Sequence, residues 1–336
     1  MSNSSGNTDF FDGLSSIAVG ITLFIFVIGV FFNAAAFIIV GRIRKSLSSS
    51  ALFYLRALAI MDSLALVFDG FIDPLKYFIG QDFGFNYYVC IIEMTLDYVT
   101  TFAANWMIVF LTFDRFLAVV CPHFYRNHSS SKRIAVYVTV IGIGLVYLIN
   151  SPVILMSYVK TKNGKCKPRN DLFYFWLITA STLSNAFISV FAVLTLNILL
   201  IRTIIRNKLF LADLHVERRM TKIIIIISVT FLMLAIPSSL ITCFHVYVHI
   251  AVKESNYVMK SLGKFGDNFD EILRSLNNSI NFFLYLFVSK RIREEICTVY
   301  RHLFALFSDD KKTTANEIDD SNQIQTTVIN RSYHTA

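Results

Sequence analysis

Residues 110–126, FLTFDRFLAVVCPHFYR, place an Asp-Arg pair near the end of an apolar segment that stops just before Pro122. A charged side chain at membrane depth is costly and usually has a function, so this pair decides how the segment is interpreted. The composition favours a membrane protein, because 55% of the 336 residues are hydrophobic and 16% are charged. Soluble domains carry about a quarter charged residues. The stretch therefore indicates the end of a helix that spans a membrane.

Seven segments are long and apolar enough to cross a membrane as helices, which takes roughly 20 residues each. Four are uncharged, namely Gly13–Gly41, Ile134–Val159, Leu172–Ile201 and Ile223–Val252. Three are interrupted by charges, namely Ala51–Phe78, Tyr87–Val120 and Asp267–Ser289. The alternating pattern of a β-barrel is absent, and helices satisfy the backbone in lipid. The sequence therefore predicts an all-α membrane protein, a seven-transmembrane helix bundle in residues 15–289.

Basic residues gather on one side of these spans, and such residues favour the cytosolic side of a membrane. The side in question holds Arg42, Arg44, Lys45, Arg126, Lys132, Arg133, Arg202, Arg206, Lys208, Arg218, Arg219, Lys222, Lys290, Arg291 and Arg293. The stretch KTKNGKCKPR, residues 160–169, breaks the rule. We expect a plasma-membrane protein with residues 1–14 outside the cell and no cleavable signal peptide, because these first residues are polar. The formal charge of +8 then reflects orientation, and no nucleic-acid partner is indicated.

Cys90 and Cys166 both fall on the predicted outer side, which is an oxidising compartment. We expect a disulfide between them, with two free thiols as the alternative. The Asn163-Gly164 pair before Cys166 predicts a hairpin in this loop. Asn3, in the triplet NSS, is a candidate glycosylation acceptor.

The segment after the last span, SKRIREEICTVYRHLFALF, places apolar side chains on one helical face: Ile292, Ile296, Val299, Leu303 and Leu306. We expect residues 290–307 to form an amphipathic surface helix on the inner leaflet, with Cys297 as a candidate for palmitoylation. Residues 308–336 are polar and carry Ser and Thr, which predicts a disordered cytosolic tail. Phosphorylation of this tail would recruit regulatory partners, although a plain solvated tail explains the composition equally well.

Asp62 lies in the middle of a predicted span with no basic residue within one turn. Such a carboxylate either takes up a proton or binds a cation. Polar side chains of the seventh and third spans lie at a matching depth: Asn277, Asn278, Asn281 and Thr100. We therefore expect a structural sodium ion at Asp62, or a protonated Asp62 hydrogen-bonded to these amides. No other cofactor is indicated.

Five carboxylates lie in the outer third of three predicted spans: Asp69, Asp73, Glu93, Asp97 and Glu271. The first four form two pairs with a spacing of four residues, so each pair shares a helical face. Carboxylates that converge on one cavity repel each other unless a cation lies among them. We expect them to bind a ligand with a cationic group, such as an amine or an Arg of a peptide. The alternative is an internal network centred on Arg274, with solvated carboxylates at the rim.

Asp114 and Arg115 lie near the cytosolic end of the third span. The plain explanation is that Arg115 extends to the membrane interface, as Arg side chains near helix ends often do. Glu217, at the cytosolic start of the sixth span, is also able to pair with Arg115. Such a pair would hold the two spans together until the sixth span moves, which is the property of a switch.

Six landmarks occur in order along the spans: Asn33 in GVFFN, Asp62 in LAIMD, Cys90 25 residues ahead of Arg115, DRF before Pro122, FLMLAIP with Phe231 and Pro237, and NNSINFFLY ending at Tyr285. Together they resemble the rhodopsin-like (class A) G-protein-coupled receptors over nearly all of residues 15–305. The INFFLY segment is similar to that of invertebrate neuropeptide receptors of the FMRFamide group.

The resemblance implies that Asp114 restrains Arg115 in the resting state, with Glu217 as a second restraint. It also implies that Arg115 contacts a heterotrimeric G protein once the sixth helix moves outward. Further members of the switch and hinge are implied in the same way: Phe116, Asn281, Tyr285, Phe231 and Pro237.

This sequence departs from the family at several of these positions. Phe116 replaces the Tyr of the usual DRY, and Ala235 stands where the family has a Trp two residues before Pro237. NFFLY, residues 281–285, lacks the proline of the usual NPxxY. Pro237 remains, so the sixth helix is still able to bend.

We expect a G-protein-coupled receptor for an extracellular neuropeptide with a cationic group, with arrestin and a kinase acting at the tail. A chemosensory or amine receptor for a small molecule is the alternative, but Ser238 and Ser239 stand where amine receptors carry aromatic residues. A transporter is less favoured, because no internal repeat is found. No catalytic set, metal-ligand spacing or phosphate loop indicates an enzyme.

Overall fold

The computed structural model describes residues 3–43, 48–79, 87–160, 166–168, 172–206, 215–251, 257–288, 290, 292–298 and 301. Some side chains in these ranges lie outside the description, among them those of Asn3, Cys166 and Glu217. The chain divides into two compact units, Met1–Ser289 and Lys290–Ala336, and each is described by itself.

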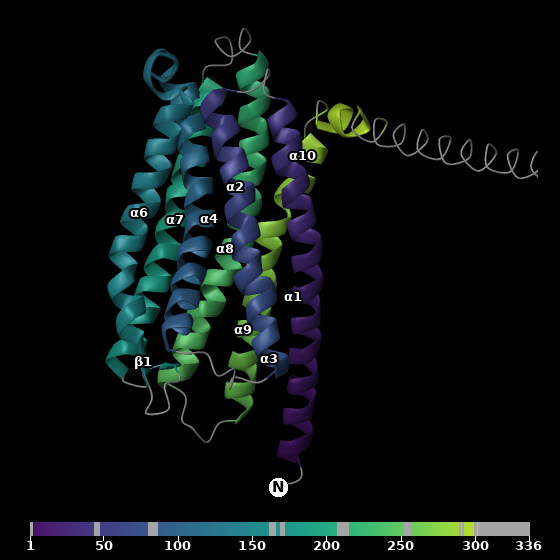
Figure 1. Ribbon diagram of the computed structural model, residues 1–336, viewed down its shortest axis with the longest axis vertical. Helices are drawn as coiled ribbons and strands as arrows, with labels where there is room; N and C mark the ends of the chain where they lie inside the picture. Colours follow the sequence, from purple (N-terminus) through teal and green to yellow (C-terminus); the bar gives the residue numbers. More distant parts are fainter. Residues whose placement is uncertain are drawn as a thin grey trace, which may run out of the picture. The chain divides into compact units, whose positions relative to one another are not determined.

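The described part of the first unit is a bundle of seven helical rods (Figure 1). Five rods are single helices: α1 (Asn3–Arg42), α4 (Tyr87–Val120), α6 (Lys132–Ser157), α7 (Leu172–Arg206) and α8 (His215–Ala251). The second rod in chain order joins α2 (Ser49–Val67), a π-helical turn η2 (Phe68–Ile72) and α3 (Asp73–Ile79). The seventh rod joins α9 (Tyr257–Ser279) and α10 (Asn281–Val288), and α5 (Pro122–Phe124) with the π-helical turn η3 (Tyr125–Ser129) leads from α4 to α6. The predicted seven-helix bundle is confirmed.

Six of the rods contain a described stretch that is long and apolar enough to cross a membrane: Gly13–Arg42, Ser49–Leu75, Tyr87–Val120, Lys132–Ser151, Phe187–Arg206 and Met220–Phe244. The seventh rod differs because six charged residues interrupt α9, namely Lys260, Lys264, Asp267, Asp270, Glu271 and Arg274. Its predicted start at Asp267 is wrong, since α9 already begins at Tyr257. The predicted fourth span also ends too late, because Val159 belongs to a strand.

The strands β1 (Tyr158–Lys160) and β2 (Cys166–Pro168) pair antiparallel, with Val159 opposite Lys167. They flank the Asn163-Gly164 pair that predicts a hairpin. Figure 1 shows β1 at the end of the bundle where α1 begins, which we call the N-terminal end. Because α2 returns along the bundle and α4 crosses it again, Arg115 lies at the opposite end, which we call the Arg115 end.

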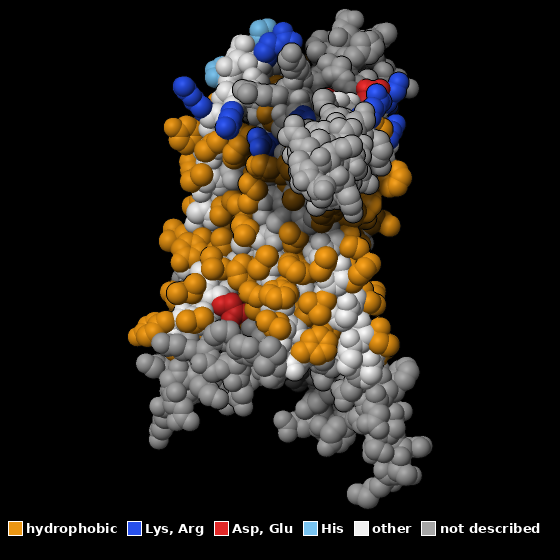
Figure 2. Space-filling view, turned by 45° about the vertical axis from the view of Figure 1, so that its right-hand side comes forward, with side chains coloured by type: hydrophobic (Ala, Val, Ile, Leu, Met, Phe, Trp, Pro, Cys, Tyr) orange, Lys and Arg blue, Asp and Glu red, His pale blue; other side chains and the backbone are white. Residues whose placement is uncertain are grey.

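The surface of the first unit is apolar in its middle. Figure 2 shows a broad band of hydrophobic side chains, and Phe24, Phe31, Val140 and Ile149 are each more than 60% exposed. Soluble monomers rarely expose apolar patches of this extent. Exposed basic side chains gather at the Arg115 end, among them Arg42, Arg126, Lys132, Arg133, Arg202 and Arg206. Both features fit a bundle whose flank is covered by lipid.

In the second unit, residues 292–298 form a helix. Lys290 Nζ lies 3.7 Å from Glu294 Oε1, in an exposed ion pair of the kind that contributes little to stability. Only this part of the predicted surface helix 290–307 is described. The palmitoylation of Cys297, whose side chain is exposed, stays a prediction. The predicted tail, residues 308–336, lies outside the described residues.

Close packing of three rods depends on the absence of a side chain at Gly29 in α1. A Cβ added there would lie 2.7 Å from Leu66 Cδ1 in α2 and 2.7 Å from Ser279 Cβ in α9. One turn away, Phe32 stacks on Phe282 with 5.1 Å between the ring centroids. A methyl group at Gly29 would therefore push α1 away from both of its neighbours.

We predict that Gly29→Ala lowers the melting temperature of the purified protein, at a cost of about 1–3 kcal/mol that is typical of overpacking. Gly20→Ala is the matched control in the same helix, because no atom lies within 4 Å of the Cβ added there. Thermal unfolding of both variants in detergent makes the comparison. An unchanged melting temperature for Gly29→Ala would contradict the close approach of α1 to α2 and α9.

Candidate functional site

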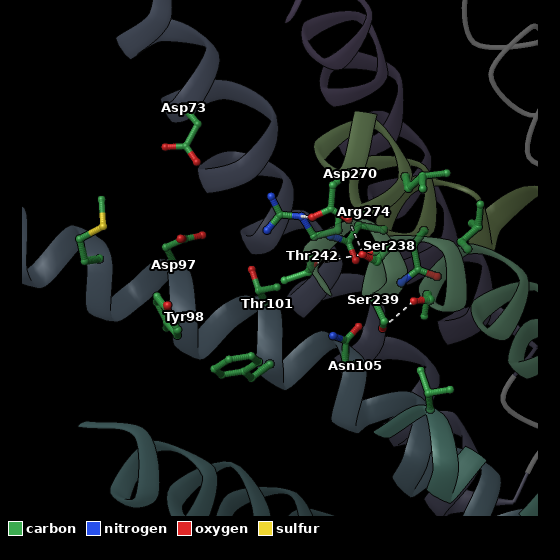
Figure 3. Close-up of a pocket in the computed structure, with 18 residues that line it drawn as sticks. Asp73, Asp97, Tyr98, Thr101, Asn105, Ser238, Ser239, Thr242, Asp270 and Arg274 are labelled. Carbon is green, nitrogen blue, oxygen red and sulfur yellow. Dashed lines mark hydrogen bonds and ion pairs between the residues drawn. The ribbon is translucent and has the colours of Figure 1, made fainter. Parts of the chain in front are cut away.

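A cavity of about 320 Å³ lies among α3, α4, α7, α8 and α9. Its walls include residues 94–105 of α4 and 234–242 of α8, in the half of the bundle nearer the N-terminal end. Figure 3 shows Asp97, Tyr98, Thr101 and Asn105 following one another along α4, with Asp270, Arg274 and Ser238 across from them. The cavity therefore combines an apolar wall with several charged and hydroxyl groups, as ligand-binding sites do.

Arg274 joins two rods through charge. Its Nη1 lies 3.3 Å from Asp69 Oδ1 in η2, and its Nε lies 3.4 Å from Asp270 Oδ2, one turn earlier in α9. The Asp69 side chain is only 2% exposed and also accepts a 3.4 Å hydrogen bond from Thr101 Oγ1 of α4. Asp69 thus lies in an internal network centred on Arg274, which is the alternative to its predicted role in ligand binding.

The other predicted carboxylates are distributed unevenly around the cavity. Asp73 and Asp97 line it, whereas Glu93 and Glu271 are not among the described lining residues. Asp69 belongs to the π-helical turn η2, and Asp73 is the first residue of α3. That the two share one helical face stays a prediction. A role of any of these carboxylates in ligand binding stays a prediction.

The contact between Asp270 and Ser238 was not predicted from the sequence. Ser238 Oγ of α8 donates a hydrogen bond to Asp270 Oδ1 of α9. The spacing of four residues between Asp270 and Arg274 could have predicted their ion pair, but no sequence signal pairs Ser238 with Asp270. The contact matters because Ser238 directly follows Pro237, which lies inside α8. Phe231, the other predicted hinge residue, is 1% exposed in the same helix.

Asp62 is buried and accepts a 2.7 Å hydrogen bond from Asn281 Nδ2 at the start of α10. Thr100 Oγ1 donates within its own helix, to the carbonyl oxygens of Leu96 and Asp97. The amides of Asn277 and Asn278 line the cavity. The contact between Asn281 and Asp62 belongs to both alternatives, the sodium site and the protonated Asp62 hydrogen-bonded to amides. The sodium ion stays a prediction, which the sodium dependence of the melting temperature would test.

At the Arg115 end, Arg115 is fully buried in a polar cluster. Its Nε and Nη2 lie 3.0 and 2.5 Å from Asp114 Oδ2, and Nη2 donates to Ser48 Oγ at 2.8 Å and to Tyr125 Oη at 2.6 Å. Tyr125 Oη also lies 3.3 Å from Asp114 Oδ2 and 2.9 Å from Ser50 Oγ. The Asp-Arg pair is therefore tied to the start of α2 and to η3. Arg115 therefore does not extend outward, as an Arg that reaches for the membrane interface would.

Tyr125 is the member of this cluster that sequence analysis missed. It is 5% exposed in η3, outside the candidate membrane spans. Burial raises the pKa of the Tyr125 phenol above its ordinary value. The phenol therefore remains protonated at physiological pH, and its hydroxyl keeps both a donor and an acceptor for Arg115 and its neighbours.

The remaining predicted switch residues lie around this cluster and along the seventh rod. Asn281 and Tyr285 are buried in α10, at 4% and 2% exposure, and Phe116 is partly buried in α4. Glu217 lies in the first turn of α8, but its side chain is outside the described residues. Its pairing with Arg115 stays a prediction.

A second buried tie joins α7 to α8 and was not predicted. Ser228 Oγ donates a 2.9 Å hydrogen bond to Asn197 Oδ1, and the two side chains are 0% and 3% exposed. The contact lies in the half of α8 nearer the Arg115 end, beside the packed pair Val119 and Leu200. A buried polar contact of this kind favours one alignment of the two helices, because Asn197 Oδ1 would lose its donor if they shifted. Ser228 Oγ also bonds to the carbonyl oxygen of Ile225 in its own helix.

Of the cysteines, Cys90 is disulfide-bonded, whereas Cys121, Cys243 and Cys297 are free. Cys166 belongs to β2, but its side chain is outside the described residues, so the predicted Cys90–Cys166 pairing stays a prediction. Glycosylation of Asn3 likewise lies on a side chain that is not described.

We predict that Tyr125→Phe lowers the melting temperature, because it removes the phenol that contacts Arg115 and Asp114. The expected cost is about 1–3 kcal/mol, as for a hydrogen-bonded group buried next to charges. Tyr137→Phe in α6 is the matched control, since that side chain is 66% exposed. If the two variants unfold at the same temperature, the phenol of Tyr125 does not stabilise the Asp114–Arg115 pair.

The comparison with known families gives a match to the family "7 transmembrane receptor (rhodopsin family)" over residues 32–285. The chain is 21% identical to the N-arachidonyl glycine receptor of Bos taurus over 284 residues, which are 82% of this chain and 81% of that receptor. It is 24% identical to the probable C-C chemokine receptor type 3 of Mus musculus over 297 residues, 84% of this chain and 78% of that one. The histamine H4 receptor of Homo sapiens is 32% identical over 103 residues, 30% of this chain and 25% of that receptor.

These relatives differ in the ligands that their names state, so they do not determine the ligand of this chain, and the finer resemblance to FMRFamide-type receptors stays a prediction. The family match covers most of the bundle, from Phe32 in α1 to Tyr285 in α10. The chain therefore belongs to the rhodopsin family of seven-transmembrane receptors and is a multi-pass G-protein-coupled receptor, not an enzyme.

Proposed function

We propose that this receptor lies in the plasma membrane with its N-terminus outside the cell, and that its cavity binds the cationic group of an extracellular ligand. The orientation is supported by the exposed basic residues at the Arg115 end, because basic residues favour the cytosolic side. The cavity lies in the other half of the bundle. A ligand from outside and a G protein from inside would then bind to opposite ends of the same helices.

The observation that carries this proposal is the charge balance of the cavity. Among the described lining residues, Asp73, Asp97 and Asp270 are acidic, and Arg274 is the one basic residue. Arg274 also compensates the buried Asp69 behind the wall. One guanidinium group therefore balances four carboxylates, Asp69, Asp73, Asp97 and Asp270. The resulting negative potential favours a cation in the remaining space.

We propose a neuropeptide as the ligand, with an Arg side chain or a free amino group as its cationic part. A cavity of about 320 Å³ matches the lower end of small-ligand sites and suffices for one side chain or terminus of a peptide. Ser238 and Ser239 line it directly after Pro237. Hydroxyl groups at this place suit a polar, hydrogen-bonding group better than the ring of a small aromatic amine.

A small amine is the second candidate, and the partial match to a histamine receptor favours it. Asp97 would then pair with the amine. An acyl amino acid, as in the name of the N-arachidonyl glycine receptors, is disfavoured for this chain. Its carboxylate would need a free cation, and Arg274 already pairs with Asp69 and Asp270.

At the Arg115 end, we propose that activation separates α8 from α4 and lets Arg115 contact the G protein. The buried contacts of Arg115 with Asp114, Ser48 and Tyr125 would hold the resting state. Such a set of contacts is exchanged as a unit, which is what a two-state switch requires. Kinase and arrestin partners at the tail remain part of the proposal on the basis of its Ser and Thr residues.

We predict that Asp97→Asn weakens the potency of a cationic agonist at least about tenfold, which corresponds to 1.4 kcal/mol or more. The agonist would come from a screen of neuropeptides and amines on cells that express the receptor, with calcium and cyclic AMP as readouts. Asp267→Asn, which removes an exposed carboxylate from α9, is the control with equal charge change. Unchanged potency of Asp97→Asn at equal surface expression would rule out Asp97 as the partner of the cationic group.

We predict that Glu217→Gln raises basal G-protein signalling, because it removes the proposed restraint between α8 and Arg115. Glu294→Gln, in the second unit, removes an exposed carboxylate and should leave basal signalling unchanged. Cyclic AMP and calcium in the absence of agonist measure the difference. Equal basal signals in both variants would remove Glu217 from the switch and leave the Asp114, Ser48 and Tyr125 contacts in place.

A further inference from the structure

We propose that Arg274 is a built-in occupant of the cation position in the cavity, and that the cationic group of the ligand displaces it from Asp270. This inference rests on the proposed function, because it names the group with which the ligand competes. It also gives Arg274 a role in ligand specificity, because the ligand has to replace this guanidinium group at Asp270.

The guanidinium groups of Arg115 and Arg274 are held in different ways. Arg115 is 0% exposed, and its contacts with Asp114, Ser48 and Tyr125 range from 2.5 to 3.0 Å. The Arg274 side chain is 38% exposed and lines the cavity, and its two ion-pair distances are 3.3 and 3.4 Å. Strong charge-assisted hydrogen bonds measure about 2.7–2.9 Å. Charge attraction therefore holds Arg274, without the short hydrogen bonds that fix Arg115.

The two carboxylates that flank Arg274 are not equally accessible. Asp69 is 2% exposed, lies behind the wall of the cavity and accepts a hydrogen bond from Thr101. Asp270 is 15% exposed and lines the cavity. A cation that enters the cavity therefore reaches Asp270 and not Asp69. Arg274 then keeps Asp69 as its partner, so no carboxylate is left buried without a cation.

Displacement at Asp270 has a consequence for α8. Asp270 Oδ1 accepts the hydrogen bond of Ser238, the residue after Pro237, while Asp270 Oδ2 faces Arg274. A ligand cation at Asp270 changes the charge and position of the group that holds Ser238. The exchange of one cation for another is thereby transmitted through Ser238 to the proline of α8.

The experiment uses methylguanidinium as a probe, because it carries the Arg head group without a chain. In Arg274→Gln the cation position is vacated, and we expect methylguanidinium to raise the melting temperature of the purified receptor at about tenfold lower concentration than in the wild type. In Asp270→Asn/Arg274→Gln this sensitivity should be lost. Arg56→Gln is the matched control, since the Arg56 guanidinium lies 3.9 Å over the Phe37 ring and does not line the cavity.

Equal sensitivity of Arg274→Gln and the wild type, or retained sensitivity in the Asp270→Asn double variant, would overturn the proposal. If Arg274→Gln does not fold, the titration is made in Asp69→Asn/Arg274→Gln, which removes the buried carboxylate together with its cation and keeps Asp270. The same two outcomes then decide. An additive that stabilises all variants equally, Arg56→Gln included, also counts against the proposal.

The readout separates this inference from the proposed function. Methylguanidinium sensitivity requires no agonist, so a receptor whose agonists prove to lack a cation would lose the proposed function and still show the shift in Arg274→Gln. Conversely, a cationic agonist that depends on Asp97, combined with no methylguanidinium shift, would leave the proposed function standing and remove Arg274 from it.

Discussion

Two guanidinium groups, Arg115 and Arg274, stand inside a bundle whose flank is apolar, and their need for partners shapes the polar interior. A buried charge that loses its partner destabilises a protein strongly. Arg115 is such a charge, and so is Asp69, which Arg274 compensates, so the rods that hold these groups cannot drift apart. Arg115 ties the end of α4 to the start of α2 and to η3, and Arg274 ties α9 to η2. Between these levels, amide and hydroxyl contacts join further rods: Asp62–Asn281, Asn33–Asn278 and Asn197–Ser228. The polar contacts thus run through the bundle from the cavity to the Arg115 end.

In the seventh rod, side-chain hydrogen bonds stand at the place where the family pattern NPxxY has a proline. NFFLY lacks that proline, and the backbone hydrogen bonds continue across the junction of α9 and α10, from Ile280 N to Leu276 O and from Leu284 N to Ile280 O. A proline would have removed such a bond and kinked the helix. Side-chain contacts instead hold this region: Asn281 donates to Asp62, and Asn33 donates to the carbonyl oxygen of Asn278. Hydrogen bonds therefore join the rod to α1 and α2 at this junction.

The sequence predicts the fold well because lipid imposes one strong rule, that about 20 apolar residues make a span. The rule fails for the start of the seventh rod. Charged residues interrupt that helix, so a count of apolar residues does not find its start at Tyr257. The site is harder to predict. Asp73 and Asp97 line the cavity as expected, but regular helical spacing does not foresee the π-helical turn η2, from which Asp69 pairs with Arg274. The partners of Arg115 are also hard to predict, since Tyr125 comes from η3, after α4, and Ser48 from the start of α2.

On α8, two ties to neighbouring helices lie on either side of Pro237, the part-buried hydrogen bond of Ser238 to Asp270 of α9 and the buried one of Ser228 to Asn197 of α7. A helix that bends at a proline changes the position of one segment relative to the other, so it cannot bend freely while both ties hold. A ligand shifts such an equilibrium only by the difference in its affinity for the two states. Binding at Asp97 alone would be equally favourable in both states unless something on α8 also changes. Asp270 supplies that difference, because it faces the cavity and also holds the residue next to the proline. We therefore expect signal transmission in this receptor to require a ligand that reaches α9, whichever residue of α4 it contacts first.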